Sequence, residues 1–283
     1  MEFPEESNLP PYLVEKSDGA TLYSTRDLAQ MRYRIDTYSP HAIFILTDIA
    51  QKLHFEQLKA TCDELQWELP VFENVLFGRM RFRDQTMSTR KGTVLKLDQF
   101  LDEAVRRATA VIKSHGDAIH TDNPAELAEM MGVGAVAYGI LSQNRKMDIV
   151  FDWDKMLSLD GNSAPYLQYT HARAKSVLRK AGITDIVDAP DVISDVTEKE
   201  RMLVNTLAEF QRVLDEARIT LMPHTLANYL FQLCQHFNTF YNDEPILQAE
   251  EPHRSLRLAL TSYTAHVLKT GAELLTIRVP DRM

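Results

Sequence analysis

The amino-acid sequence predicts a fold in two parts, an α/β region followed by an all-α helix bundle. In the first half, two apolar runs of strand length, 41–47 and 71–77, alternate with helical segments. Continuous apolar runs are typical of parallel strands covered on both faces. After residue 164, the segments with a periodic apolar stripe all have helical spacing, which indicates a helix bundle. We therefore expect two domains, 1–160 and 161–283, divided at a polar Asp-Gly-Asn-Ser break.

The composition is that of a globular protein, with 45% hydrophobic and 25% charged residues among 283. No run is apolar enough to span a bilayer, and the first residues are acidic where a secretory peptide is basic. We therefore expect a cytosolic protein with no membrane partner. Cys62 and Cys234 lie far apart without metal-ligand spacing, so we expect two buried thiols, no disulfide and no metal site.

The order of elements in the first half is strand, helix, strand, loop, helix, which is the order of a Rossmann-type half sheet. In such sheets ligands lie beyond the carboxyl ends of the strands, so Asp48, Gln51 and His54 become candidate site residues. The predicted elements are a helix from Ser24 or Thr25 to about Ile35, strands 41–47 and 71–77, helices 53–65, 98–112 and 124–141, and a short strand near 149–153. The predicted bundle helices are 165–181, 197–220, 223–241 and 252–275.

Two short polar stretches carry the chemistry of the first half. Met87-Ser88-Thr89-Arg90-Lys91-Gly92 combines hydroxyls, two cations and a glycine, which together can surround phosphate oxygens; the alternative is a solvated turn with incidental charges. Tyr23 and Asp27, at a strand-to-helix turn, can hold a substrate cation. The simpler explanation of Asp27 is that a carboxylate in the first helical turn complements the helix dipole.

Several strings in this sequence resemble the arginyl-tRNA synthetases, a family of class I aminoacyl-tRNA synthetases. They are Ser-Asp-Gly-Ala-Thr-Leu-Tyr-Ser-Thr-Arg-Asp-Leu-Ala (17–29), Met-Ser-Thr-Arg-Lys-Gly (87–92), Asn-Ser-Ala-Pro-Tyr-Leu-Gln-Tyr-Thr-His-Ala-Arg (162–173) and Arg-Val-Pro-Asp-Arg-Met (278–283). They occur in the family's order and extend over nearly the whole chain. The resemblance implies the second part of a Rossmann-type catalytic domain, with a KMSKS-like loop, followed by a helical anticodon-binding domain of the DALR type.

The resemblance also implies roles for individual residues. Tyr23, Asp27 and Gln51 would contact arginine, and His54 would lie near ATP. The loop Met87, Ser88, Thr89, Arg90 and Lys91 would bind the ATP phosphates, with Ser88, Arg90 and Lys91 acting in catalysis. Thr86 stands where many class I enzymes have the first lysine of this signature.

The implied function is that of an arginine–tRNA ligase, with arginine, ATP with Mg²⁺ and the tRNA for arginine as substrates and no organic cofactor. No HIGH-type histidine string occurs in these residues, so we expect activity to need an N-terminal synthetase half. The chain is then either a portion of a longer synthetase or a separate product that pairs with that half. The alternative function is a non-catalytic tRNA-binding module descended from a synthetase.

Anticodon recognition normally uses aromatic or guanidinium planes under bases, with cations on the backbone. The second half offers two such groups of residues, which could equally be core aromatics and rim charges. The expected tRNA-binding residues are Tyr166, Gln168, Tyr169 and Arg173 at the start of the helical part, and Arg278 and Arg282 at its end.

Overall fold

The structure is a computed structural model that describes residues 1–82, 96–116, 119–190 and 194–283. The chain forms two compact units. Unit 1 comprises Met1–Arg79 with Lys146–Asp148, and unit 2 comprises Met80–Arg145 with Ile149–Met283. The helices that follow the first two strands thus belong to the same compact unit as the C-terminal bundle.

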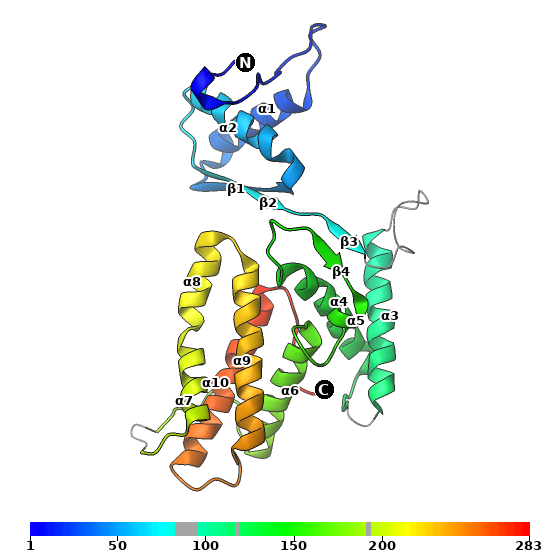
Figure 1. Cartoon of the computed structure of the whole chain (residues 1–283), viewed down its shortest axis with the longest axis vertical. Coiled ribbons are helices and arrows are strands. Elements are labelled where there is room, and N and C mark those ends of the chain that lie inside the picture. Colours follow the sequence, from blue (N-terminus) through cyan, green and yellow to red (C-terminus); the bar gives the residue numbers. More distant parts are fainter. Residues whose placement is uncertain (83–95, 117–118, 191–193) are drawn as a thin grey trace. The chain divides into compact units, whose positions relative to one another are not determined.

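Unit 1 is built on two parallel strands, β1 (Ala42–Asp48) and β2 (Val71–Phe77). Their register runs from Ala42 opposite Val71 to Asp48 opposite Phe77. Helices α1 (Tyr23–Tyr38) and α2 (Lys52–Glu64) lie on one side of this sheet (Figure 1). The short 3₁₀ helices η1 (Glu5–Ser7) and η2 (Ile49–Gln51) complete the unit. This is the predicted order of parallel strands and helices.

The two faces of the β1–β2 sheet differ in exposure. Toward the helices, Ile43 packs with Phe55, Leu58 and other apolar side chains in a small core. The opposite face carries apolar side chains of both strands that remain exposed: Phe44, Leu46, Val71 and Phe77. The sequence pattern predicts strands covered on both faces, whereas the described residues cover only one.

The first part of unit 2 joins two short strands to two packed helices. Strands β3 (Met80–Phe82) and β4 (Ile149–Phe151) pair in parallel, and the sequence pattern did not indicate β3. Helices α3 (Leu97–His115) and α4 (Pro124–Leu141) pack together, followed by the short α5 (Trp153–Met156). Gly132 allows the close approach, because a Cβ there would lie 2.7 Å from the backbone nitrogen of Val105.

The bundle of unit 2 contains α6 (Ala164–Lys180), α7 (Glu198–Ala208), α8 (Phe210–Thr220), α9 (Pro223–Asp243) and α10 (His253–Leu274). In Figure 1, α7 and α8 follow one another along α9. Their inner side chains form the largest hydrophobic core among the described residues, which includes the fully buried Leu203, Leu230, Phe237 and Leu268.

The prediction of one helix over 197–220 is wrong, because the helix breaks at Glu209. The Tyr229 hydroxyl on α9 donates a hydrogen bond of 2.9 Å to the carbonyl oxygen of Thr206. That carbonyl would otherwise accept within a continuous helix, and Tyr229 also stacks on Phe210 just beyond the break. The α9 aromatic ring therefore stabilises the break.

A buried charged cluster joins the start of α7 to α10. Glu200 is fully buried and lies 2.6 Å from Nε of Arg257, and Glu244 lies 2.9 Å from another nitrogen of the same guanidinium. Burial raises the pKa of Glu200, but the hydrogen bonds from Arg257 and from the Thr197 backbone outweigh burial and hold this pKa below its usual range. The first turn of α7 therefore contributes a carboxylate to a buried ion pair.

Three expectations drawn from composition concern cysteines, metals and membranes. Cys62 and Cys234 are both fully buried free thiols, as predicted, and burial raises the pKa of Cys62 to about 11. In the described ranges, no three His, Cys, Asp or Glu side chains are grouped as metal ligands. The helices in those ranges include none long and apolar enough to cross a membrane.

Candidate functional site

The candidate substrate site of unit 1 is centred on an Asp–His pair. Asp27 on α1 and His54 on α2 face each other, with 2.7 Å between Oδ2 of Asp27 and Nε2 of His54. Both side chains are about one-fifth exposed. Among the described residues, Oδ1 of Asp27 has no hydrogen-bond partner, so the carboxylate retains an acceptor for a second donor.

The position of Asp27 in α1 differs from the prediction. The helix begins at Tyr23 rather than at Ser24 or Thr25. The Ser24 and Thr25 hydroxyls donate to the carbonyls of Leu13 and Val14, and the Thr25 hydroxyl also accepts from the backbone N–H of Leu22, the residue before the helix. Asp27 is thus the fifth helical residue, outside the first turn. The helix dipole acts mainly on the first turn, so it accounts poorly for this carboxylate.

Aromatic rings surround His54. The Tyr23 ring lies 5.0 Å from the imidazole between centroids and the Tyr12 ring 5.6 Å. Tyr23 is 62% exposed, whereas Tyr12 is 3% exposed and its hydroxyl is buried without a hydrogen-bond partner. The structure therefore brings together Tyr23, Asp27 and His54, and adds Tyr12, which the sequence analysis missed because an isolated tyrosine among prolines carries no motif.

Gln51 is exposed at the end of η2, immediately before α2, and its side chain does not cap that helix. Asp48 at the end of β1 is paired with Arg79, with 2.9 Å between its carboxylate and Nε. The predicted phosphate-binding residues Met87, Ser88, Thr89, Arg90 and Lys91 lie outside the described residues.

Unit 2 contains a basic pocket of about 370 Å³ lined by α6, α9 and the end of the chain. Among the residues that the structure describes, those lining it include no Asp or Glu. The aromatic and cationic side chains in its wall are Tyr169, Arg173, Arg179, Lys180, Tyr241 and Arg282. Concave basic surfaces with exposed aromatic rings are suited to nucleic-acid bases and phosphates.

Arg173 lies at the centre of the aromatic part of this pocket. Its guanidinium is 4.7 Å from the centroid of the Tyr169 ring and 4.8 Å from that of Tyr241, and it donates to Oδ1 of Asn238. Two stacked rings and a hydrogen bond hold the cation in one orientation. Tyr166, also predicted, is half-buried and accepts a hydrogen bond from Asn238 through its hydroxyl.

The remaining predicted tRNA-binding residues have different environments. Arg282 lines the basic pocket and lies 3.1 Å from exposed Asp122, whereas Arg278 is paired with Glu129 and is absent from the pocket wall. Gln168 is fully buried, and its amide donates to the carbonyl oxygens of Met130 and Arg278. This burial contradicts a direct contact of Gln168 with RNA, because its donors are already used by the protein.

Sequence analysis missed Tyr241, Arg179 and Lys180 as pocket residues. A signal for Lys180 was present, since positions 169, 173, 176 and 180 share one helical face. No local pattern places Tyr241, because it comes from α9 through the packing of the bundle.

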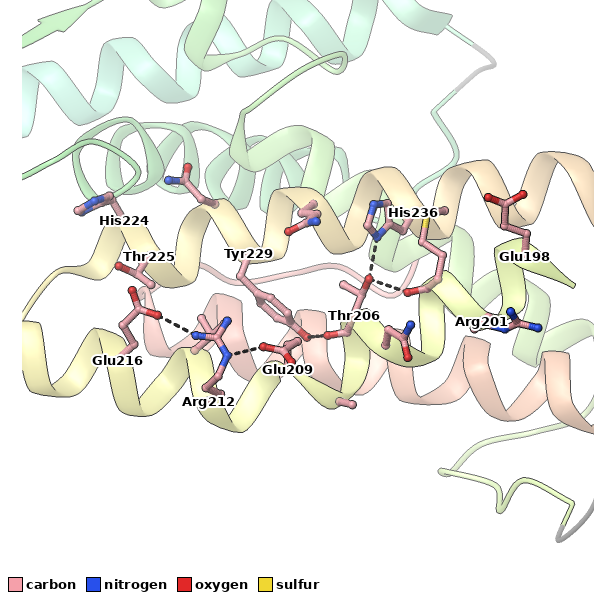
Figure 2. A pocket seen from close by; sticks show the side chains of 16 residues that line it. Glu198, Arg201, Thr206, Glu209, Arg212, Glu216, His224, Thr225, Tyr229 and His236 are labelled. Carbon is pink, nitrogen blue, oxygen red and sulfur yellow. Dashed lines mark hydrogen bonds and ion pairs between the residues drawn. The ribbon is translucent and has the colours of Figure 1, made fainter. Parts of the chain in front are cut away.

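A larger groove of about 1090 Å³ lies between α9 and the α7–α8 pair. Figure 2 shows that Arg212 in this groove bridges Glu209 and Glu216, and that Thr206 contacts His236. Cationic and anionic side chains in this groove pair with each other. The groove therefore lacks the positive charge that characterises the basic pocket.

Comparisons with known proteins match both parts of the chain. Residues 2–153 match the family described as tRNA synthetases class I (R), catalytic domain, and residues 167–283 match the DALR anticodon binding domain. An arginine–tRNA ligase of Fusobacterium nucleatum is 40% identical over 99% of this chain, and one of Synechococcus elongatus is 41% identical over 96%. These alignments cover 49% and 48% of the two relatives.

The arginyl-tRNA synthetase of Thermus thermophilus is similar in structure, with a TM-score of 0.81 and 27% identity. The alignment covers 98% of this chain and 53% of that structure. A parallel α/β region followed by a helical anticodon-binding domain is the architecture of a class I aminoacyl-tRNA synthetase. Within that class, the chain belongs to the arginyl-tRNA synthetase family and spans about half the length of the curated relatives it matches.

Proposed function

We propose that this chain supplies part of an arginine–tRNA ligase, which activates arginine with ATP and transfers the arginyl group to its tRNA. The observation that supports this most directly is the arrangement of Asp27, Tyr23 and His54 on one face of α1 and α2. A partly buried carboxylate with a free acceptor oxygen can pair with a guanidinium through charge-assisted hydrogen bonds.

Each residue has a proposed role in binding arginine. Asp27 neutralises the guanidinium, the exposed Tyr23 ring covers it, and His54 fixes the orientation of the carboxylate by donating from Nε2. Gln51, exposed one helical turn before His54, supplies an amide for the polar end of the substrate. His54 is therefore proposed to lie beside the arginine site. We also propose that it contacts ATP, as the resemblance implies.

The ATP site is proposed to use the loop Met87, Ser88, Thr89, Arg90 and Lys91. Activation joins the arginine carboxylate to the α-phosphate and releases pyrophosphate, so negative charge grows on the leaving group. Arg90 and Lys91 would stabilise that charge, and Ser88 and Thr89 would donate to phosphate oxygens. Mg²⁺ would enter with ATP as part of the substrate, bridging phosphates.

The basic pocket is proposed to bind the tRNA for arginine. Tyr169 and Tyr241 offer ring faces to bases, and Arg173, Arg179, Lys180 and Arg282 offer charge to phosphates. Tyr166 and Arg278 are retained as contacts at the margins of this surface. The functional boundary is proposed at 160/161, between the two family matches, although the compact units divide at 79/80.

Catalysis is proposed to require further synthetase sequence, corresponding to the part of the relatives that this chain does not cover. The exposed apolar face of the β1–β2 sheet supports this, because Phe44, Leu46, Val71 and Phe77 form a surface suited to burial. Additional strands would also pair with the edges of this sheet, along which the described residues place no further strand.

The test is arginine-dependent exchange of pyrophosphate into ATP, measured with this chain alone and with an added N-terminal synthetase half. We expect exchange only in the mixture. The double variant Arg90→Ala, Lys91→Ala should lower the exchange rate far more than it changes the KM for arginine. If the mixture shows no exchange but the chain binds the tRNA for arginine, the non-catalytic module becomes the better description.

A further inference from the structure

The last six residues, 278–283, which we call the tail, are held to α6 through their backbone. Three side chains of α6 donate hydrogen bonds to carbonyl oxygens of the tail. Gln168 donates to Arg278 over 2.8 Å, Nδ1 of His171 to Pro280 over 2.9 Å, and Arg179 to Asp281 over 2.8 Å. The tail therefore follows a path set by donors along one helix.

Two of these contacts reach the tail beyond Val279, and the contact made by His171 is the more deeply buried of the two. The His171 side chain is 1% exposed and Pro280 is also buried. A carbonyl oxygen can only accept, so Nδ1 must carry the hydrogen, and the contact fixes both the tautomer and the ring orientation. Burial lowers the pKa of His171, although the hydrogen bond to the Pro280 carbonyl acts in the opposite direction. The lowered pKa keeps the ring neutral near pH 7.

The tail continues from this contact directly into the basic pocket. Arg282 and Met283, two and three residues beyond Pro280, line the pocket wall together with Arg173 and Tyr169 of α6. His171 is absent from that wall. Two residues of chain span at most about 7 Å, so the placement of Pro280 limits where the Arg282 guanidinium can lie.

We propose that His171 is a positioning residue for nucleic-acid binding: by holding the Pro280 carbonyl, it places Arg282 in the wall of the basic pocket, where the guanidinium contacts an RNA phosphate. This inference rests on the proposed tRNA binding and adds to it a residue that never touches RNA. It separates α6 into two functional faces, one that contacts RNA through Tyr169 and Arg173 and one that orients the tail through His171.

The experiment measures binding of the full chain to a transcript of the tRNA for arginine across a series of salt concentrations. His171→Leu removes the donor, His171→Asn keeps a donor near the Nδ1 position, and Arg282→Ala removes the guanidinium. We expect His171→Leu and Arg282→Ala each to weaken binding roughly two- to tenfold, the effect of losing one contact, and to reduce the salt slope by about 1. His171→Asn should restore most of the affinity.

The double variant separates positioning from general destabilisation. If His171 acts through Arg282, then His171→Leu in the Arg282→Ala background should cause no further loss of affinity. Fully additive losses, or unchanged binding in His171→Leu, would overturn the proposal. His236→Leu is the matched control, because this histidine contacts Thr206 in the large groove (Figure 2) and not the tail; we expect its affinity and salt slope to equal those of the unmodified chain.

Digestion of the tail by carboxypeptidase gives a readout that needs no RNA, because the donors on α6 hold the backbone of the tail through its carbonyl oxygens. His171→Leu should speed removal of residues 281–283, and His236→Leu should not. If the unmodified chain fails to bind the transcript while His171→Leu still releases the tail, the proposed tRNA binding is wrong and the attachment of the tail is correct. If His171→Leu leaves the rate of tail digestion unchanged, the positioning role itself is wrong.

Discussion

The two compact units bury apolar surface to very different extents. In unit 1 the β1–β2 sheet covers one face with α1 and α2 and leaves Phe44 and Leu46 half or more exposed on the other. In unit 2 the bundle encloses Leu230 and Phe237 completely, and even the Glu200–Arg257 ion pair is buried. Unit 2 therefore has the core of an independently stable domain, whereas unit 1 retains a surface typical of an interface.

This difference predicts which of the two units is stable by itself. Burial of apolar area is the main favourable term in folding, so unit 2 should unfold cooperatively by itself. Unit 1 has a small core and should gain stability when its exposed sheet face is covered. The predictions below test that contrast, beginning with the largest expected effect.

Replacing Arg257 should destabilise unit 2 severely. Arg257→Met leaves Glu200 buried without its main counter-charge and should lower the free energy of unfolding of unit 2 by about 3–5 kcal/mol. Urea denaturation followed by circular dichroism measures it. The control is Arg212→Met, whose exposed pairs with Glu209 and Glu216 should cost at most about 1 kcal/mol. Similar losses in both variants would show that the buried cluster is not the stabilising feature.

A leucine-to-alanine substitution should reduce stability in unit 2, whereas in unit 1 it should mainly weaken association with a partner. Leu230→Ala removes a fully buried side chain that packs against Gly271 and should cost about 2–5 kcal/mol. Leu46→Ala, on the exposed sheet face, should change the stability of this chain by less than about 0.5 kcal/mol. Leu46→Ala should instead weaken association with an N-terminal synthetase half, measured by ultracentrifugation. A large loss of stability from Leu46→Ala alone would mean that this face is already covered.

Asp27→Asn should impair substrate binding without unfolding unit 1. In an enzyme completed with its N-terminal half, we expect weaker binding of arginine by roughly 2–5 kcal/mol, since the variant removes the counter-charge of a desolvated guanidinium. The Michaelis constants for arginine and ATP in pyrophosphate exchange measure this. Equal losses for the two substrates would contradict the assignment of Asp27. Asp36→Asn, at an exposed pair on the same helix, is the matched control.

The smallest expected effect is a dependence of the stability of unit 2 on pH. Burial lowers the pKa of both His171 and His236 in the folded state. As the pH falls below about 6.5, the ordinary pKa of histidine, the unfolded chain binds protons first, so the stability of unit 2 decreases. The urea midpoint of unit 2 should therefore be lower at pH 5.5 than at pH 7.5. A double variant, His171→Asn with His236→Asn, should show a flatter profile.

Much of the fold could be predicted from the sequence because its elements follow local rules. The two strands and α4 match their predicted ranges within a residue, since apolar runs and an Asn123-Pro124 start signal mark their limits. The start of α7 coincides with a capping box of Thr197 and Glu200, a local pattern that the sequence analysis did not use. Resemblance supplied Tyr23, Asp27 and His54 together, which spacing alone could not, because 27 residues separate the Asp–His pair.

The remaining features depend on contacts between distant residues. The break at Glu209 requires a hydroxyl from α9, and the burial of Glu200 requires Arg257 from α10. Gln168 looked like an RNA-binding amide in sequence, yet it joins α4 and the tail. Polar residues that serve the protein's own backbone have the same local pattern as those that bind ligands, so only the packed structure distinguishes them.

The attachment of the tail has a consequence for how these positions vary among relatives. The donors on α6 contact carbonyl oxygens of residues 278, 280 and 281, which every amino acid carries. Side chains at 278 and 281 can therefore change without loss of these hydrogen bonds, while replacements at Gln168 and His171 remove a donor from a buried site. An alignment of relatives should show stronger constraint on these two residues of α6 than on Asp281 in the tail that they hold.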